Sequence, residues 1–173
     1  VYQGLLENYS PDNIGLYGCS AGATLAAQTI ARLLKEQLPL PAAIGMLSGA
    51  ASRWTGDSMY IVEKLYGAEL VQAQLDHPYL CNADLDDPLV TPAASDEVMA
   101  QFPPSLLLAS VRDFALSSVA HTHSRLVQLG VDADLHIWEG MRHAFMLIPD
   151  YEESQQAYQV IVRFFKKYMG GRD

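Results

Sequence analysis

A serine framed by two glycines is the first feature of the sequence that could carry out chemistry. The pentapeptide Gly18-Cys19-Ser20-Ala21-Gly22 follows a short apolar run and precedes a segment with helical periodicity. A serine at such a strand-to-helix turn presents its hydroxyl at the edge of a sheet, and the glycines avoid collisions in the tight bend. This context predicts that Ser20 is a nucleophile. The alternatives are that Ser20 only caps the helix, or that Cys19 is the nucleophile.

A serine hydroxyl needs a base to become a nucleophile, and the chain has five histidines. His143 follows the fourth predicted strand by a short turn, residues 139–142, at the carboxyl edge where a parallel sheet places its ligands. Two of the others lie two positions apart on a predicted helix, one is inside a strand and one precedes a proline (His121, His123, His136 and His77). His143 is therefore the predicted base.

The third member of a serine triad is an acid that orients the imidazole and stabilises its charged form. Asp113 follows the third predicted strand by two residues, at the same edge of the sheet as His143. The competing acids lie in a loop without a preceding strand, at the start of a strand, or very close to the base in sequence (Asp84, Asp86, Asp87, Asp132, Asp134 and Glu139). Asp113 is the predicted acid.

The elements around these residues alternate between apolar strands and amphipathic helices. Strands are predicted at residues 14–17, 42–47, 105–111 and 131–138, and helices at residues 2–9, 21–37, 59–66, 68–75, 95–101, 116–129 and 151–168. Such alternation indicates an α/β fold, a parallel sheet with helices on both faces. We expect a single domain over residues 1–173, with an excursion of helices and loops at residues 52–104.

The composition argues against several classes of function. The chain has 11 basic and 20 acidic residues and a net charge of −9, which repels phosphate backbones and anionic lipids, so neither nucleic-acid nor membrane-surface binding is expected. No apolar run approaches the about 20 residues needed to span a bilayer. The two cysteines, Cys19 and Cys81, are too few for a disulfide scaffold and favour a reducing, cytoplasmic compartment. The sequence begins at Val1 without a signal-like region, as expected for the middle of a protein.

Taken together, these motifs resemble the hormone-sensitive-lipase-like branch of the α/β-hydrolases, which are carboxylesterases and lipases. The matching stretches are GCSAG at residues 18–22, DPLVTP at 87–92, FPPSL at 102–106, RDFAL at 112–116, and the run from LGV at 129–131 to RHAF at 142–145. The resemblance implies hydrolysis of small-molecule esters through an acyl-enzyme on Ser20, without a cofactor. It also implies that the backbone N–H of Ala21 helps to hold the oxyanion, and that the chain is the C-terminal half of the fold, strands five to eight.

Two departures from the family pattern shape these expectations. Ser117 and Ser118 stand where such enzymes often carry a second Asp and a Glu. The His-Gly-Gly-Gly stretch, which supplies further N–H groups to the oxyanion hole, is absent from the chain. We therefore expect weak or no activity from these 173 residues alone. The first strand is expected to expose an edge, so that the chain forms a homodimer there or comes from a longer polypeptide.

Two other functions stay open at this point. A serine peptidase or amidase of the same fold would share the turn and the order of the triad, and a truncated remnant would have no catalytic role. Trp54, Met59, Tyr60 and Met146 are candidates for an apolar pocket wall, with core packing as the alternative role for each.

Overall fold

A parallel four-stranded sheet organises the molecule. The computed structural model describes residues 1–66, 78–80 and 83–170. The strands are β1 (Gly15–Cys19), β2 (Ala43–Leu47), β3 (Ser105–Arg112) and β4 (Ala133–Arg142), and they lie side by side in the order β1-β2-β3-β4. β2 and most of β3 are buried on both faces, which explains why their sequences are continuous apolar runs rather than alternating patterns.

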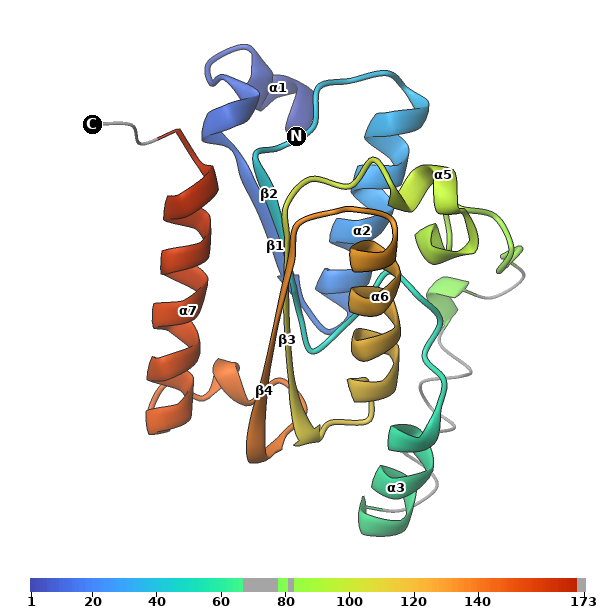
Figure 1. The fold of residues 1–173 in the computed structure, drawn as a ribbon, viewed down its shortest axis with the longest axis vertical. Coiled ribbons are helices and arrows are strands. Elements are labelled where there is room, and N and C mark those ends of the chain that lie inside the picture. Colours follow the sequence, from blue (N-terminus) through green and yellow to red (C-terminus); the bar gives the residue numbers. More distant parts are fainter. Residues whose placement is uncertain (67–77, 81–82, 171–173) are drawn as a thin grey trace.

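Helices cover both faces of this sheet (Figure 1). α2 (Ala21–Lys35) and α6 (Leu116–Gln128) lie against one face, and α7 (Glu152–Tyr168) lies against the other. The buried face of α2 consists mostly of alanines, whose small side chains allow its backbone to approach the strands closely. The predicted α/β fold, with a parallel sheet between helical layers, is confirmed.

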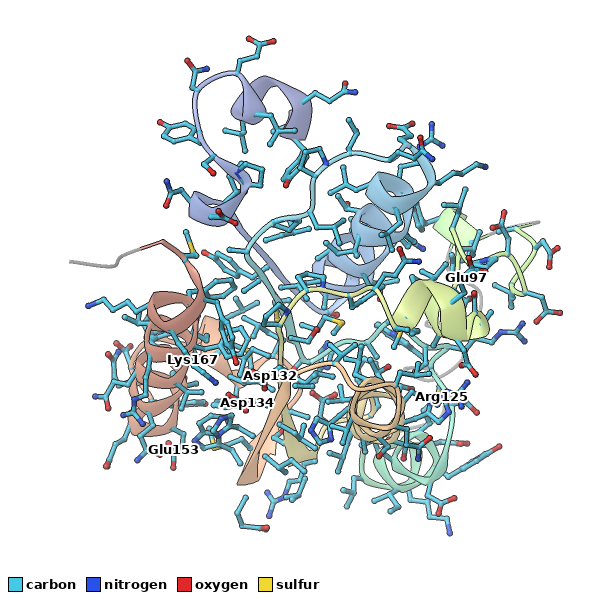
Figure 2. The ribbon with its side chains drawn as sticks, turned by 45° about the horizontal axis from the view of Figure 1, so that its top comes forward. Glu97, Arg125, Asp132, Asp134, Glu153 and Lys167 are labelled. Atoms are coloured by element: carbon cyan, nitrogen blue, oxygen red, sulfur yellow. The ribbon has the colours of Figure 1, made fainter. Side chains whose placement is uncertain are left out.

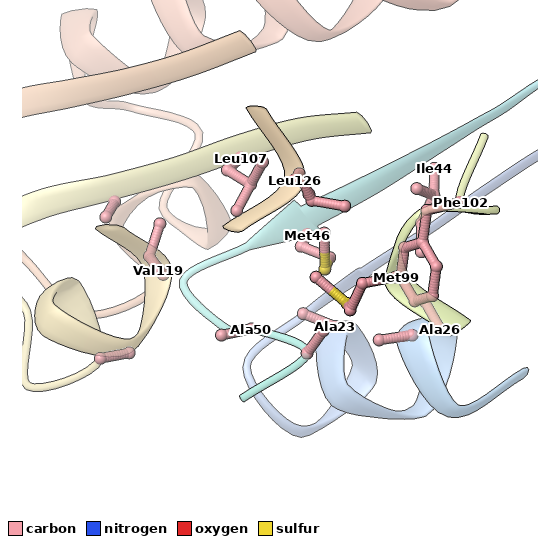
Figure 3. Close-up of a cluster of buried hydrophobic side chains, with 14 of the residues drawn as sticks. Ala23, Ala26, Ile44, Met46, Ala50, Met99, Phe102, Leu107, Val119 and Leu126 are labelled. Carbon is pink, nitrogen blue, oxygen red and sulfur yellow. The ribbon is translucent and has the colours of Figure 1, made fainter. Parts of the chain in front are cut away.

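Each face of the sheet has its own hydrophobic core. Met46, Leu107, Val119 and Leu126 belong to the core on the side of α2 and α6 (Figure 3). Leu106 and Leu108 belong to the core under α7, because successive side chains of a strand point to opposite faces. β3 therefore contributes side chains to both cores. Among the described residues, no helix combines the length and apolar character that crossing a membrane requires.

The chain between β2 and β3 makes a long excursion outside the sheet. Its described elements are α3 (Asp57–Tyr66), the 3-10 turns η2 (Pro78–Leu80) and η3 (Pro92–Ala94), and α5 (Asp96–Met99). The helix predicted at residues 68–75 lies outside the described residues. Three short elements complete the chain: α1 (Tyr2–Leu6), η1 (Pro11–Asn13) and η4 (Phe145–Leu147).

The fourth strand differs from its prediction. β4 continues to Arg142, so the turn expected at residues 139–142 is strand, and His143 follows the strand directly. β4 keeps its pairing with β3 as far as the pair Arg112–Arg142 by means of an irregularity after Ser110. Gly140, with φ 71°, accepts a backbone angle there that other residues rarely adopt. The glycine that suggested a turn therefore marks an irregularity within the strand.

Candidate active site

Ser20 occupies a strained turn between β1 and α2. Its backbone angles, φ 57° and ψ −121°, lie outside the regions that residues with side chains populate readily. Such a conformation costs about 1–3 kcal/mol and persists only where the surrounding structure imposes it. Ser20 stands at the N-terminus of α2, but its side chain makes no capping hydrogen bond to the helix. The capping role considered for Ser20 is therefore wrong.

Two positions near this turn must be glycine, because neighbouring backbone lies too close to leave room for a side chain. A Cβ atom on Gly18 would lie 2.2 Å from the carbonyl oxygen of Gly22, and one on Gly49 would lie 2.6 Å from the carbonyl oxygen of Ser20. A Cβ atom on Gly22, by contrast, would meet nothing within 4 Å beyond its own helix backbone. The expectation that both flanking glycines prevent collisions is confirmed for Gly18 and wrong for Gly22.

Ser20, His143 and Asp113 form one hydrogen-bonded chain. Nε2 of His143 lies 2.8 Å from Oγ of Ser20, and Nδ1 of His143 lies 2.7 Å from Oδ1 of Asp113. The three residues follow the carboxyl ends of β1, β3 and β4, which share the lower edge of the sheet in Figure 1. The parallel sheet therefore brings together side chains that are 123 and 30 positions apart in the sequence.

The hydrogen bonds indicate where the imidazole carries its proton. The Asp113 carboxylate can only accept, so Nδ1 of His143 is the protonated nitrogen and Nε2 has a lone pair. In the neutral imidazole this lone pair faces the Ser20 hydroxyl, which can donate to it. The arrangement is the one needed to remove the serine proton as the oxygen attacks.

Asp113 is fully buried, and hydrogen bonds hold one of its carboxylate oxygens in place. Its side chain is fully buried, and Oδ1 accepts the backbone N–H of Ala115 at 2.8 Å as well as the bond from His143. Oδ2 is also buried and has no hydrogen-bond partner among the described residues. The backbone N–H of Ala115 thus holds the carboxylate oxygen that faces the imidazole. In this position the carboxylate can stabilise a positive charge on His143.

Cys19 is poorly suited to act as the nucleophile at neutral pH. Burial, and to a smaller extent the negative charge of Asp113, raise the pKa of its thiol to about 11. Because the thiolate is the nucleophilic form of cysteine, a thiol with this pKa is unreactive at pH 7. Its sulfur contacts the sulfur of Met146 at 3.8 Å. Between the two adjacent candidates, the environment favours Ser20.

The other histidines lie away from this edge or outside the described residues. His123 places Nε2 3.1 Å from a backbone carbonyl oxygen at the start of β4, at the opposite end of the sheet. His136 lies within β4, and His121 is exposed on α6. His77 lies outside the described residues. Of the described histidines, His143 is the one that contacts Ser20.

Among the described carboxylates, Asp113 is the one that bonds His143, and the competing acids have other surroundings. Asp132 and Asp134 lie at the amino end of β4 beside Lys167 of α7 (Figure 2), with 3.7 Å between Nζ of Lys167 and Oδ2 of Asp132. Asp86 forms an ion pair with Arg53. Asp84 and Asp87 accept backbone N–H groups within their own loop, and Glu139 is exposed on β4. In the described part of the chain, no three His, Cys, Asp or Glu side chains are grouped as metal ligands.

An apolar pocket of about 320 Å³ opens beside the serine turn. Ala21, the residue after Ser20, forms part of its wall together with Leu25 and Trp54. Leu80, Leu85 and Val90 from the excursion add further apolar surface. Of the other residues considered for a pocket wall, Met59 and Met146 are buried in the hydrophobic cores and Tyr60 is exposed.

The backbone N–H of Ala21 is the candidate donor to negative charge that develops beside Ser20. Ala21 is the first residue of α2, and the first N–H groups of a helix have no acceptor within the helix. The partial positive charge at a helix N-terminus also favours an anion there. Because Ala21 both follows Ser20 and lines the pocket, its N–H is suited to an oxyanion that forms on a substrate bound in the pocket.

Ser48 is a structural residue of the site that the sequence did not reveal. It is fully buried at the end of β2, and its Oγ accepts the backbone N–H of Ala144 at 3.0 Å. This bond ties the residue that follows His143 to the neighbouring strand. Ala144 has φ 55°, a strained angle that this contact helps to maintain. The signal available in the sequence was the Ser48-Gly49 pair directly after a predicted strand.

Comparisons with known proteins agree with this architecture. A family model described as alpha/beta hydrolase fold matches residues 1–147. An esterase of Acinetobacter venetianus is 26% identical over 170 residues, which cover 95% of this chain and 55% of that protein. An esterase of Fusarium pseudograminearum is 39% identical over 67 residues, 39% of this chain and 21% of that protein.

Solved structures show the same similarity. An esterase from the bacterial hormone-sensitive lipase family is 30% identical with a TM-score of 0.87, covering 98% of this chain and 58% of that one. Another esterase structure is 32% identical with a TM-score of 0.84, covering 97% and 53%. The chain thus spans about half the length of these relatives. With the matching family model, the parallel sheet and the strained serine turn all in agreement, the chain belongs to the alpha/beta hydrolase fold family.

Proposed function

We propose that this chain carries the catalytic centre of a serine carboxylesterase, with Ser20 as nucleophile, His143 as base and Asp113 as the acid of the triad. The hydrogen-bonded chain from Ser20 through His143 to Asp113, with distances of 2.8 and 2.7 Å, is the main support. The similar proteins that are esterases favour an ester over an amide as the substrate.

The proposed reaction proceeds in two halves. Ser20 Oγ attacks the carbonyl carbon of the ester while its proton moves to Nε2 of His143, and the Asp113 carboxylate stabilises the imidazolium. His143 returns the proton to the departing alcohol, which leaves an acyl group on Ser20. A water molecule then gives a proton to His143 and attacks the acyl carbon. The acid is released, and Ser20 recovers its proton.

The substrate would be a small ester with an apolar arm. The 320 Å³ pocket beside Ala21 is lined mainly by apolar side chains, so it would exclude water from such an arm when the ester carbonyl lies at Ser20. Either the acyl arm or the alcohol arm of the ester could occupy this pocket. Esters that differ in only one arm would show which of them the pocket binds.

We further propose that the 173 residues alone hydrolyse esters slowly. The Ala21 N–H is one donor to the oxyanion, and the chain contains no His-Gly-Gly-Gly stretch to provide others. Removing a single oxyanion donor from a serine hydrolase typically lowers kcat by about 10²–10³-fold. Turnover of a short p-nitrophenyl ester at a rate ordinary for an enzyme, about 10 s⁻¹, would contradict this part of the proposal.

The test of the proposed function is covalent labelling of Ser20 by a fluorophosphonate, which needs an activated serine but no repeated turnover. The wild-type chain should be labelled, with the adduct on the peptide that contains Ser20, and Ser20→Ala should not. Cys19→Ser is the matched control beside the nucleophile and should be labelled like wild type. Absence of label on the wild-type chain would indicate a non-catalytic remnant. Faster cleavage of aminoacyl amides than of esters would indicate a peptidase.

A further inference from the structure

The ring of Phe114 covers one face of the His143 imidazole. The two ring centroids lie 4.2 Å apart and the ring planes differ by 28°, which is a stacked arrangement. Phe114 is only 4% exposed, so this face of the imidazole is shielded from water. Because Phe114 directly follows Asp113, one turn of the chain supplies both the carboxylate that bonds the imidazole and the ring that stacks on it.

Trp54 supports this stack from the segment that follows β2. The centroid of its ring lies 5.0 Å from that of the Phe114 ring and 6.3 Å from that of the His143 ring, which it approaches edge-on. Trp54 also lines the pocket beside Ala21. We call Phe114 and Trp54 the aromatic platform. The platform therefore connects the catalytic imidazole with the wall of the substrate pocket.

A serine hydroxyl holds Trp54 in place from both sides. Oγ of Ser118 donates to the carbonyl oxygen of Arg53 at 2.8 Å and accepts the backbone N–H of Thr55 at 3.0 Å. Arg53 and Thr55 are the two sequence neighbours of Trp54. Because the Ser118 side chain is a hydroxyl, this clamp carries no charge.

A second pair of bonds ties the same segment to Phe114. Oγ of Ser58 donates to the carbonyl oxygen of Phe114 at 2.7 Å and accepts the backbone N–H of Ser117 at 3.0 Å. Gly56, with φ 101°, makes the approach possible, because a Cβ atom there would lie 2.6 Å from Cβ of Ser117. These bonds hold the segment after β2 to the start of α6, next to the Phe114 ring that stacks on His143.

We propose that Phe114, supported by Trp54, is a positioning residue for His143, an inference that rests on the esterase function proposed above. The hydrogen bond to Asp113 fixes one atom of the imidazole but leaves the ring able to tilt about that contact. A flat ring against the imidazole face opposes this tilt, so that Nε2 stays directed at Ser20 Oγ. Such control matters because a misplacement of 1 Å can lower a rate about 10²-fold.

The kinetic test uses the 173-residue chain and a fluorophosphonate at varied concentration, which separates the binding constant KI from the maximal labelling rate kinact. Phe114→Leu keeps an apolar side chain but removes the flat face. We expect kinact to fall about 10- to 100-fold while KI stays unchanged, because Phe114 does not line the pocket described above. Trp54→Leu should lower kinact and also raise KI, because Trp54 lines that pocket.

Phe102→Leu is the matched control for the loss of a buried aromatic ring. Phe102 (Figure 3) is 5% exposed and belongs to the same hydrophobic core as Phe114. It precedes the amino end of β3, whereas His143 follows the carboxyl end of β4. The control should keep the wild-type kinact. A Phe114→Leu variant that reacts like wild type, or that loses no more than Phe102→Leu, would overturn the proposal.

A second measurement needs no chemical reaction and leaves Phe114 and Trp54 unchanged. In the proton NMR spectrum of the wild-type chain, the His143 ring signals, identified by their loss in His143→Asn, should lie upfield of those of the exposed His121. The cause is the ring current of the stacked Phe114. Unshifted His143 signals would overturn the proposal. An upfield shift in a wild-type chain that is not labelled at Ser20 would instead refute the esterase function and leave the stack intact.

Discussion

Individual side chains at the site owe their properties to neighbours that are distant in sequence. Cys19 and Ser20 are adjacent, yet the thiol is partly buried against the core under α7 while the hydroxyl meets an imidazole. Desolvation and the Asp113 carboxylate both oppose a second negative charge on Cys19. The choice between the two nucleophiles is therefore electrostatic as well as geometric.

The raised pKa of Cys19 predicts slow alkylation. In a Cys81→Ser background, iodoacetamide at pH 7.5 should modify Cys19 in the folded chain about 100-fold more slowly than in the chain unfolded by urea. The reason is that the folded thiol has a pKa of about 11, against about 8.5 for an ordinary cysteine. Mass spectrometry of the alkylated peptide over time measures both rates, and equal rates would contradict the prediction.

The same shift gives the direction of a pH effect on stability. Between the ordinary pKa of about 8.5 and the folded value, the folded state keeps a proton that the unfolded state has released. The contribution of Cys19 to the free energy of unfolding therefore falls as the pH rises through this range. Cys19→Ala should show a shallower decline than the wild-type chain in urea titrations at pH 8 to 10.

The connection between β1 and α2 is the element that positions Ser20, the proposed nucleophile. It combines the strained angles of Ser20 with the contact of Gly18 against the backbone of Gly22. Gly49 presses on the same turn from the end of β2. A strand, a helix and a neighbouring loop therefore impose the conformation together, which is how a turn that costs free energy can persist.

Substitutions of the two flanking glycines should have opposite effects. Gly18→Ala places a methyl group against backbone and should lower the free energy of unfolding by about 1–3 kcal/mol. Gly22→Ala adds a methyl group in open space on a helix and should raise it by a few tenths to about 1 kcal/mol. Urea denaturation of the two variants measures both changes. A loss of stability in Gly22→Ala would show that its space is occupied.

The two outer strands of the sheet, β1 and β4, each pair with one neighbour among the described strands. β2 and β3 are enclosed, while β1 pairs with β2 alone among the described strands and places Tyr17 63% exposed to solvent. Unpaired strand edges bind other strands readily. The relatives are nearly twice as long as this chain, so the edge of β1 is a place where further polypeptide could pair. For the 173-residue chain by itself, a second copy is the available partner.

We therefore expect the chain to form a homodimer through β1. Light scattering should give twice the chain mass of 19.0 kDa, and Tyr17→Lys should shift the protein toward monomer because a charge at the edge opposes pairing. Tyr60→Lys is the matched control, since Tyr60 is 65% exposed on α3. A wild-type chain that remains a 19.0 kDa monomer at high concentration would contradict the prediction.

The strands and the meeting of the three candidate residues could be predicted because local patterns encode them. Apolar runs at β2 and β3 reflect burial on both faces, and residues after parallel strands share one edge. The end of β4 could not be predicted in this way, because Gly140 favours a turn locally and only pairing with β3 extends the strand. The role of Gly49 was also hidden, since it depends on the distance to Ser20.

The sequence by itself therefore determined the α/β architecture and identified Ser20, Asp113 and His143 as residues that would meet. The tertiary structure alone decided their hydrogen-bond lengths, the elevated pKa of Cys19 and the stacking of Phe114 on the imidazole. The physical reason is that periodicity and turn chemistry act between near neighbours along the chain. Desolvation, ring stacking and close backbone contacts depend on distances between segments that only packing brings together.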